Sequence, residues 1–240
     1  MKIVIFGYGK MGRMIEQAAL EMGHAVLGHI DVDNTADAET MPAADVVLDF
    51  SGPGLLPCTA AYIRRTGAAL VSGTTGYTDA DMAVLKELSA CAPVIYSANY
   101  SLGVALFRHM LEELPRDLLE RFDIEITETH HRQKKDAPSG TAKMLLAAID
   151  PEHQKKVVSG RDGIVGARTD NEIGVLSLRG GTVAGEHTVY LFGEDETISI
   201  KHSAASRRIF VNGALQTAEK LCGRPAGWYS LDELLFGKED

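Results

Sequence analysis

The sequence contains little cysteine, and its cysteines are far apart. Three occur in 240 residues, at Cys58, Cys91 and Cys222, and none belongs to a Cys-x-x-Cys pair. An odd number at wide spacing supplies neither a disulfide framework nor the paired ligands of a structural zinc site. We therefore expect no metal centre, and a chain that folds around an ordinary apolar core, consistent with its 45% apolar residues.

An excess of basic residues and a long apolar run are also lacking. The formal net charge is −9, whereas non-specific binding of DNA or RNA needs a basic surface. No apolar run approaches the roughly 18 residues of a membrane span. The first residues, Met-Lys, lead directly into a strand-like segment and do not resemble a secretion signal. We expect no nucleic-acid partner, no membrane contact and a cytoplasmic location.

A glycine-rich turn follows the first predicted strand. Residues 2–6, Lys-Ile-Val-Ile-Phe, are typical of a buried strand. The turn Gly7-Tyr8-Gly9-Lys10-Met11-Gly12 comes next, and a helical pattern follows it. This order is the dinucleotide fingerprint. Gly7 permits the tight turn, Gly9 lets a pyrophosphate approach the backbone, and Gly12 lets the helix pack on the strand. We expect NADH or NADPH as the cofactor.

Strands and helices alternate over the first hundred residues. The predicted strands are 2–6, 25–30, 45–50, 68–72 and 93–96, and the predicted helices between the later ones are 55–66 and 79–90. This alternation predicts an α/β fold with a Rossmann-type, doubly wound parallel sheet, whose ligands bind beyond the carboxyl ends of the strands. The segments at these ends are polar or glycine-rich: Asp31, Ser51, Gly73-Thr74-Thr75-Gly76 and Ser97-Ala98-Asn99-Tyr100.

Asp31 lies at the end of the second predicted strand. An acid roughly 20 residues after the glycine turn is where this fold binds a ribose hydroxyl. The alternative is that Asp31 is only a polar strand end at the surface.

The pattern changes after about residue 121. Apolar and polar residues alternate in 122–128, 174–178, 188–192 and 197–202. A period of two predicts strands with one solvated face, and therefore a second α+β domain with an open mixed or antiparallel sheet. A helical period returns at 207–222 and predicts a helix that packs back on the first domain. We expect residues 1–100 and 208–240 to form the dinucleotide-binding domain, and residues 101–207 the domain for substrate binding and oligomerisation.

Two adjacent histidines precede a cationic segment and a Ser-Gly-Thr turn. Histidine transfers protons near neutral pH, which makes His130 and His131 candidate proton donors. Lys134 and Lys135 follow, and Ser139-Gly140-Thr141 opens a predicted helix at 142–148. The free amides of a helix N-terminus bind carboxylates or phosphates. The segment therefore predicts a site that binds a small acid and protonates it. The alternatives are that His131 only supports its neighbours and that Ser139 only caps the helix.

Several segments together resemble one enzyme family. Glu128-Thr129-His130-His131 and Ala137-Pro138-Ser139-Gly140-Thr141-Ala142 resemble the signature of 4-hydroxy-tetrahydrodipicolinate reductase (dihydrodipicolinate reductase), a family of lysine and diaminopimelate biosynthesis. The likeness covers nearly the whole chain. The other segments in the family's order are Gly7–Gly12, 73–76, 99–104, Arg179-Gly180-Gly181, Gly185-Glu186-His187-Thr188 and Ala205-Ser206-Arg207.

The resemblance implies a function for each predicted site residue. A nicotinamide cofactor reduces a cyclic, unsaturated dicarboxylate: hydride goes to C4 of the ring, His130 protonates the neighbouring carbon, and Lys134 stabilises the developing charge. His131, Ser139, Gly140 and Thr141 match the residues that hold the substrate carboxylates. Gly7, Lys10, Met11, Asp31, Gly73, Thr75 and Tyr100 match the cofactor side, to which the fold adds Gly9, Gly12, Thr74, Ser97 and Asn99. The family also implies a homotetramer.

Two departures from the family pattern concern the cofactor. The glycine turn is one residue shorter than in many members, and Val32 stands where some members carry an arginine for the 2′-phosphate of NADPH. Because Asp31 repels that phosphate, we expect NADH to serve at least as well as NADPH, although Lys10 or Arg13 could reach the phosphate.

Two other functions remain open at this point. One is a different two-domain NAD(P)-dependent dehydrogenase, which would leave the His-His segment unexplained. The other is a non-catalytic NAD(H) sensor, which would keep the glycine turn and need no proton donor.

Overall fold

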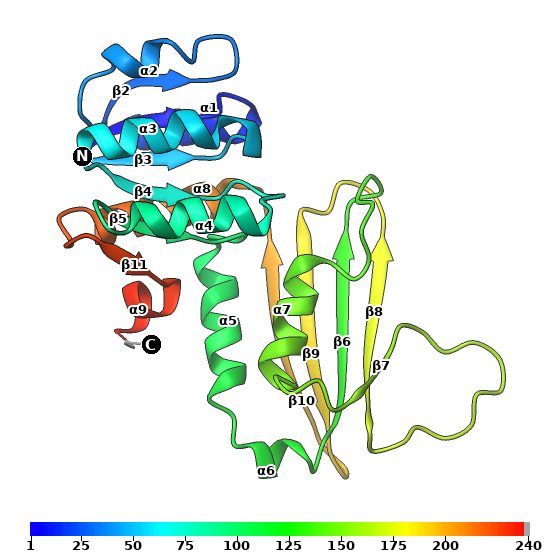
Figure 1. Cartoon of the computed structure of the whole chain (residues 1–240). Coiled ribbons are helices and arrows are strands. Elements are labelled where there is room, and N and C mark those ends of the chain that lie inside the picture. The colour runs from blue at the N-terminus through cyan, green and yellow to red at the C-terminus, as the bar shows by residue number, and fades with distance from the viewer. Residues whose placement is uncertain (238–240) are drawn as a thin grey trace. The chain divides into compact units, whose positions relative to one another are not determined.

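The computed structural model of the chain describes residues 1–237 and divides into two compact units (Figure 1). Unit 1 comprises Met1–Leu102 and the segment from Arg208 onward, and unit 2 comprises Gly103–Arg207. The sequence predicts domain borders at 100/101 and 207/208, and the structure crosses between units at 102/103 and 207/208. Residues 238–240 of the expected first domain lie outside the described residues.

The described residues of unit 1 form a six-stranded sheet in which every neighbouring pair is parallel. The strand order is β11-β5-β4-β3-β1-β2. This is the predicted α/β, doubly wound architecture. The strands are β1 (Lys2–Phe6), β2 (Ala25–Ile30), β3 (Val46–Asp49), β4 (Ala69–Ser72), β5 (Pro93–Tyr96) and β11 (Gly227–Tyr229). The sequence does not predict β11, because three residues are too few to show a period.

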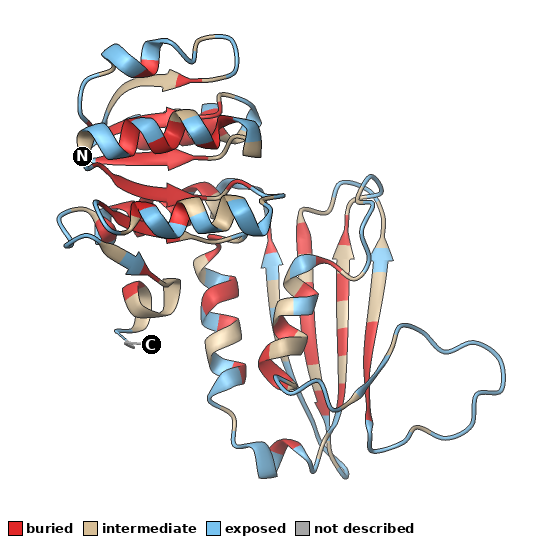
Figure 2. Cartoon of the chain, viewed as in Figure 1, coloured by how far each residue is buried: buried red, intermediate tan, exposed pale blue. Residues whose placement is uncertain are grey.

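Helices cover both faces of this sheet, and alternate residues of each strand supply the two cores. Ile3 and Ile5 pack in one apolar cluster, whereas Val4 and Phe6 pack in the other. All four are fully buried, which Figure 2 shows as red strands. The helices are α1 (Lys10–Glu21), α2 (Asp37–Thr40), the 3-10 turn η1 (Pro53–Leu55), α3 (Leu56–Thr66), α4 (Asp79–Leu88), α8 (Arg208–Leu221) and α9 (Leu231–Phe236).

The predicted return of the chain to unit 1 is confirmed by α8. Its buried residues Val211, Ala214 and Leu215 join the same apolar cluster as Ile3 and Ile5. The sequence does not predict the short helix α2 between β2 and β3, because one helical turn of mostly polar residues carries no apolar period.

The described residues of unit 2 form a five-stranded mixed sheet in the order β10-β9-β6-β8-β7. The pairs β6–β8 and β7–β8 are parallel, whereas β6–β9 and β9–β10 are antiparallel. The strands are β6 (Asp123–His130), β7 (Lys156–Val158), β8 (Glu172–Arg179), β9 (Gly185–Phe192) and β10 (Thr197–Ala204), and the helices are α5 (Leu102–Glu112), α6 (Arg116–Leu119) and α7 (Gly140–Ile149).

One face of strand β6 has apolar core residues in its first half and polar residues in its second half. Ile124 and Ile126 lie in the core with residues of α5 and α7. The next residues on the same face are Glu128 and His130, and both are buried. Because side chains alternate along a strand, the face that builds the core also positions these two polar groups.

Candidate active site

The three glycines of the first turn meet three different surroundings. Gly7 has φ +85°, and a Cβ there would lie 2.5 Å from the Cα of Ser51. A Cβ at Gly12 would overlap the carbonyl oxygen of Gly7, well inside the 3.0 Å that Cβ atoms keep. A Cβ at Gly9 would meet no described atom within 4 Å, and no described side chain caps α1 at this end. The space beside the N-terminus of α1 at Gly9 is therefore open, as an anion site requires.

Hydrogen bonds hold the carboxylate of Asp31 beside this turn. The amide of Tyr8 donates to Oδ2 at 2.8 Å, and the amide of Val32 donates to Oδ1 at 2.8 Å. Gly7, Gly9, Asp31, Val32 and residues 50–55 line a cavity of about 320 Å³. The Asp31 carboxylate and the glycine turn thus line one cavity, which suits a ribose hydroxyl and a phosphate in adjacent positions.

Tyr8 occupies the side of the turn next to Asp31. Its ring stacks on His29 with 3.6 Å between ring centroids, and its hydroxyl bonds to Glu16. Arg13 lies over the Tyr8 ring, 5.4 Å from the centroid, and its Nε donates to the Tyr8 carbonyl oxygen at 3.3 Å. Arg13 is therefore engaged with Tyr8, while Lys10 is exposed.

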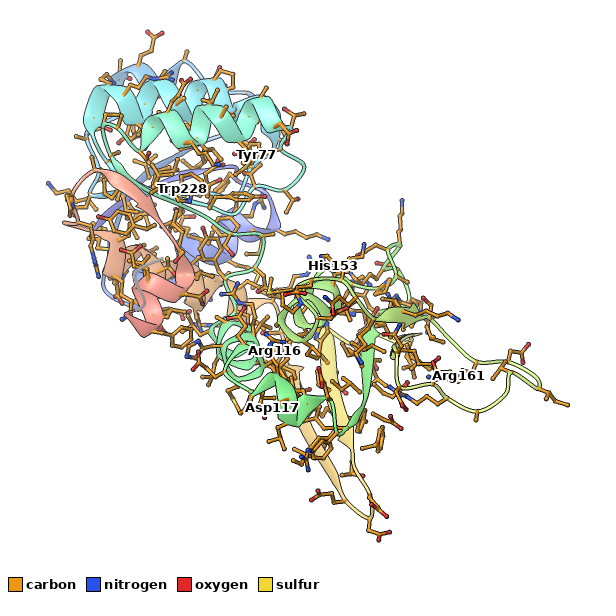
Figure 3. All side chains as sticks on the ribbon, turned by 60° about the horizontal axis from the view of Figure 1, so that its bottom comes forward. Tyr77, Arg116, Asp117, His153, Arg161 and Trp228 are labelled. Carbon is orange, nitrogen blue, oxygen red and sulfur yellow. The ribbon has the colours of Figure 1, made fainter. Side chains whose placement is uncertain are left out.

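A buried carboxylate that the sequence analysis misses connects two strand ends. Asp49, the last residue of β3, accepts hydrogen bonds from Ser51 Oγ (2.6 Å), Thr74 Oγ1 (3.0 Å) and Tyr77 Oη (3.0 Å; Tyr77 is labelled in Figure 3). Burial raises the pKa of Asp49. Thr74, a predicted cofactor residue, is buried, so its hydroxyl organises the strand ends.

The other predicted cofactor residues divide into exposed and buried groups. Thr75 is exposed, and Gly73 has no room for a side chain beside Phe50. Ser97 and Asn99 form a turn in which Ser97 Oγ donates to the Asn99 carbonyl oxygen at 2.9 Å. Tyr100 is fully buried, and its hydroxyl donates to the carbonyl oxygen of Ser72 at 2.7 Å. Its side chain belongs to the core of unit 1.

In unit 2, Glu128 connects His130 to an arginine and to the Ser-Gly-Thr turn. Its Oε2 lies 2.6 Å from His130 Nδ1. Arg179 donates from Nη1 to Oε2 at 2.9 Å and from Nη2 to Oε1 at 2.7 Å. The Ser139 amide donates to Oε1 at 3.1 Å. Both carboxylate oxygens therefore accept hydrogen bonds, including a two-point contact with a guanidinium.

These contacts set the charges at the site. Burial opposes ionisation of Glu128, but the hydrogen bonds from Arg179 and His130 prevail and lower the pKa of Glu128 to about 2. Burial, together with the nearby charges of Lys134 and Arg179, lowers the pKa of His130, although the Glu128 carboxylate acts in the opposite direction. Near neutral pH the resting site thus holds a carboxylate and a neutral imidazole, which donates its Nδ1–H to Glu128. Nε2 is then the nitrogen that takes up and releases a proton.

Ser139 both caps α7 and contacts a third histidine. Its Oγ accepts from the Ala142 amide at 3.1 Å and lies 3.0 Å from His187 Nε2. The rings of His187 and His130 meet edge to face, with centroids 5.1 Å apart. Burial lowers the pKa of His187 to about 4. The predicted cap at Ser139 is present, and His187 holds its hydroxyl in place.

The remaining predicted residues lie on the segment between β6 and α7 and at the start of α7. Lys134 Nζ lies 3.0 Å from Asp136 Oδ1. Nδ1 of His131 is buried and has no hydrogen-bond partner in the described part of the chain. Gly140 opens α7, and a Cβ there would meet no described atom within 4 Å; Thr141 follows it in the first turn. The start of α7 at Gly140 therefore faces open space.

The geometry can be compared with known proteins. Two family models match the chain: the N-terminus of dihydrodipicolinate reductase over residues 1–100, and the C-terminus of the same enzyme over residues 103–235. The chain belongs to the dihydrodipicolinate reductase family.

Full-length relatives carry the same name. The 4-hydroxy-tetrahydrodipicolinate reductase of Exiguobacterium sp. (strain AT1b) is 41% identical over 98% of this chain and 95% of the relative. The reductase of Staphylococcus aureus is 42% identical over 98% of this chain and 100% of the relative. The chain is therefore an NAD(P)H-dependent oxidoreductase of lysine and diaminopimelate biosynthesis. This decides against both alternatives, the non-catalytic NAD(H) sensor and a different two-domain dehydrogenase.

Solved structures agree in fold. A dipicolinate-bound dihydrodipicolinate reductase from Paenisporosarcina sp. TG-14 superposes with a TM-score of 0.73 at 21% identity, covering 98% of this chain and 99% of that one. A diaminopimelate (DAP) dehydrogenase of C. glutamicum gives 0.54 at 13% identity, over 95% and 92%. Among residues 1–237 we find no helix long and apolar enough to cross a membrane.

The sequence alone indicates no role for Glu128, Arg179, His187 and Asp49. The sequence does contain one indication for Glu128. It lies on the same face of the strand as Ile124 and Ile126, so an acid stands in an otherwise apolar row. Arg179 and His187 stand in segments that match the family, but only strand pairing brings them to β6.

Proposed function

We propose that the chain reduces 4-hydroxy-tetrahydrodipicolinate, by way of dihydrodipicolinate, to tetrahydrodipicolinate, with hydride added at C4 of the ring and His130 as the proton donor. The observation that carries the proposal is the contact of His130 Nδ1 with Glu128 at 2.6 Å, which leaves Nε2 for the substrate. Family membership supports the substrate class.

The residues of unit 1 fit a dinucleotide. The open amides at Gly9, Lys10 and Met11 suit the pyrophosphate, and the fixed carboxylate of Asp31 suits the ribose hydroxyls. The exposed Thr75 and the turn at Ser97–Asn99 lie at the neighbouring strand ends. When bound, the cofactor supplies the hydride.

The residues of unit 2 suit a dicarboxylate. The amides of Gly140 and Thr141 at the start of α7, with the Ser139 hydroxyl, can receive one carboxylate. Lys134 and His131 suit the second carboxylate and the charge that develops on the ring nitrogen. Substrate binding would break the ion pair of Lys134 with Asp136. Because the Asp136 side chain is mostly exposed, water can solvate it instead, and losing the pair costs little free energy.

His130 completes the reaction by proton transfer. Hydride addition to C4 of a conjugated C=C–C=N system places electron density on the neighbouring carbon, which accepts the proton of His130 Nε2. A bound dicarboxylate brings negative charge to the imidazole and thereby favours its protonated form, since opposite charges stabilise each other.

We also propose that NADH serves at least as well as NADPH. Asp31 is held toward the cavity by two amides, so it meets a 2′-phosphate with like charge. Arg13 is engaged with Tyr8, whereas Lys10, the other cation of the turn, is exposed.

A homotetramer in the cytoplasm completes the proposal. The face of the unit 2 sheet opposite to its core carries Leu178 and Phe192, both exposed, and Tyr190 stacked on Phe192 with centroids 5.5 Å apart. An apolar strand face of this kind gains free energy when a second copy covers it. Family membership supports the same assembly.

A coupled assay tests the function. Aspartate semialdehyde, pyruvate and a dihydrodipicolinate synthase generate the substrate in place, and absorbance at 340 nm follows oxidation of NADH or NADPH. We expect synthase-dependent oxidation that falls about 10²–10⁴-fold in His130→Gln, with cofactor binding intact. Absence of oxidation with both cofactors, despite NADH binding, would refute the proposal.

A further inference from the structure

Glu128 is an ionised carboxylate in a row that otherwise builds the apolar core. It follows Ile124 and Ile126 on the same face of β6 and is completely buried. Burying a charge is costly unless hydrogen bonds and an opposite charge compensate it. Here Arg179, the Ser139 amide and His130 all contact the carboxylate. An arrangement this costly to build indicates a function that an apolar residue cannot perform.

We propose that Glu128, with Arg179 as its counter-ion, is a positioning residue for the reduction: it fixes the ring and tautomer of His130 and holds the Ser139 turn in the same frame. The inference rests on the proposed function of His130 as the proton donor. It deepens that function, since it explains why one nitrogen of the ring, Nε2, delivers the proton.

The tautomer follows from the acceptor character of Glu128. An ionised carboxylate only accepts hydrogen bonds, so His130 must carry its proton on Nδ1. A second proton then enters at Nε2, and it leaves from Nε2 to the ring carbon. The C–H bond forms with the electron pair that hydride addition displaced, and the N–H electrons remain on Nε2 as a lone pair. Without the carboxylate, neither tautomer is fixed.

A glycine lies beside Nε2. A Cβ at Gly185, on the neighbouring strand β9, would lie only 3.0 Å from His130 Nε2. The charged and titratable groups that face the ring are Glu128 on its own strand, Arg179 on β8, His187 on β9 and Lys134 on the following segment. Of these only Glu128 is an acid, so it alone stabilises the imidazolium.

Arg179 connects Glu128 to the segment between β6 and α7. It pairs with His130 in the β6–β8 register, and its Nη2 also donates to the Asp136 carbonyl oxygen at 2.7 Å. The segment that carries Lys134 is thus bonded to the group that neutralises Glu128. A lysine would keep the charge and lose the two-point contact.

Glu128→Gln tests the inference, with Glu125→Gln as its matched control. Glu125 lies on the same strand, faces the opposite side and is bonded by Arg161 (labelled in Figure 3) and Arg168. We expect Glu128→Gln to lower kcat about 10²–10⁴-fold, the range in which loss of a tautomer-fixing carboxylate falls. NADH affinity should hold, and Glu125→Gln should leave kcat unchanged.

A second readout does not depend on turnover. ¹⁵N NMR of histidine-labelled full-length protein, with His130 assigned by its loss in His130→Gln, reports the tautomer. Wild type should show Nδ1–H, and Glu128→Gln should show a mixture of the two tautomers, because the Gln side chain both donates and accepts hydrogen bonds. A wild-type Nε2–H tautomer would overturn the inference even with full activity. Absence of turnover in wild type would instead refute the proposed function.

Arg179→Lys covers the case in which Glu128→Gln does not fold. It retains a cation beside Glu128 but loses the two-point contact that holds the carboxylate in place, so we expect a smaller loss of kcat and a shifted His130 spectrum in which the Nδ1–H tautomer still prevails. Unchanged kcat with an unchanged spectrum would overturn the part of the inference that concerns Arg179, and wild-type kcat in a folded Glu128→Gln would overturn the whole.

Discussion

Alanine at Gly9 and alanine at Gly12 should separate cofactor binding from folding. Gly9 precedes α1 with φ −75° and ψ −152°, values that alanine adopts, and a Cβ there meets no described atom within 4 Å. Loss of a glycine cap for alanine costs under about 1 kcal/mol. The added methyl group nevertheless fills the space in which we place the pyrophosphate. We expect near wild-type stability and NADH binding weakened at least tenfold, or about 1.4 kcal/mol.

Gly12→Ala should behave differently. Alanine in a helix gains about 1 kcal/mol over glycine, but this Cβ would overlap the Gly7 carbonyl oxygen, which belongs to the backbone and cannot rotate away. Overpacking a rigid site costs about 1–3 kcal/mol, so we expect a net loss of stability together with weaker binding. Urea unfolding and NADH fluorescence titration measure both quantities. Wild-type binding by Gly9→Ala, or wild-type stability of Gly12→Ala, would refute the reasoning.

Two further predictions concern charge. Asp31→Asn should raise kcat/KM for NADPH relative to NADH about tenfold, equivalent to about 1.4 kcal/mol, in the coupled assay; an unchanged ratio would show that Asp31 does not meet the 2′-phosphate. For His187, the folded-state pKa of about 4 lies below the usual 6.5, so the unfolded chain binds more protons between these values. Stability should therefore fall as pH is lowered from about 6.5 to 4, and thermal unfolding of His187→Gln should show a shallower fall, whereas an equal slope would assign the loss to other groups.

The sequence predicts the sheet of unit 1 well because its strands are buried on both faces and bounded by glycine-rich turns. It predicts the unit 2 strands because one face is solvated and the period of two is plain. It misses β7 and β11, each only three residues long. Such segments become strands through pairing with β8 and β5, which is a tertiary effect.

For the site, the sequence points to His130, Lys134 and the Ser139 turn because they lie within one short segment. It assigns no role to Arg179 and His187, which reach β6 only through strand pairing. It also does not distinguish Thr74 and Tyr100, whose side chains point into unit 1, from Thr75, which is exposed. Local sequence patterns predict which helix, strand or loop carries the reactive side chains, whereas burial in the folded chain decides which of them a ligand can reach.

The two segments of unit 1 have a consequence for biosynthesis of the chain. Helix α8 and strand β11 complete the sheet and cover one of its faces, yet they follow all of unit 2 in the sequence. As the chain leaves the ribosome, β1 to β5 emerge with that face only partly covered, by α1, while unit 2, one continuous segment, can fold first. Until residue 221 is made, the nascent chain exposes an apolar surface that can aggregate or bind chaperones.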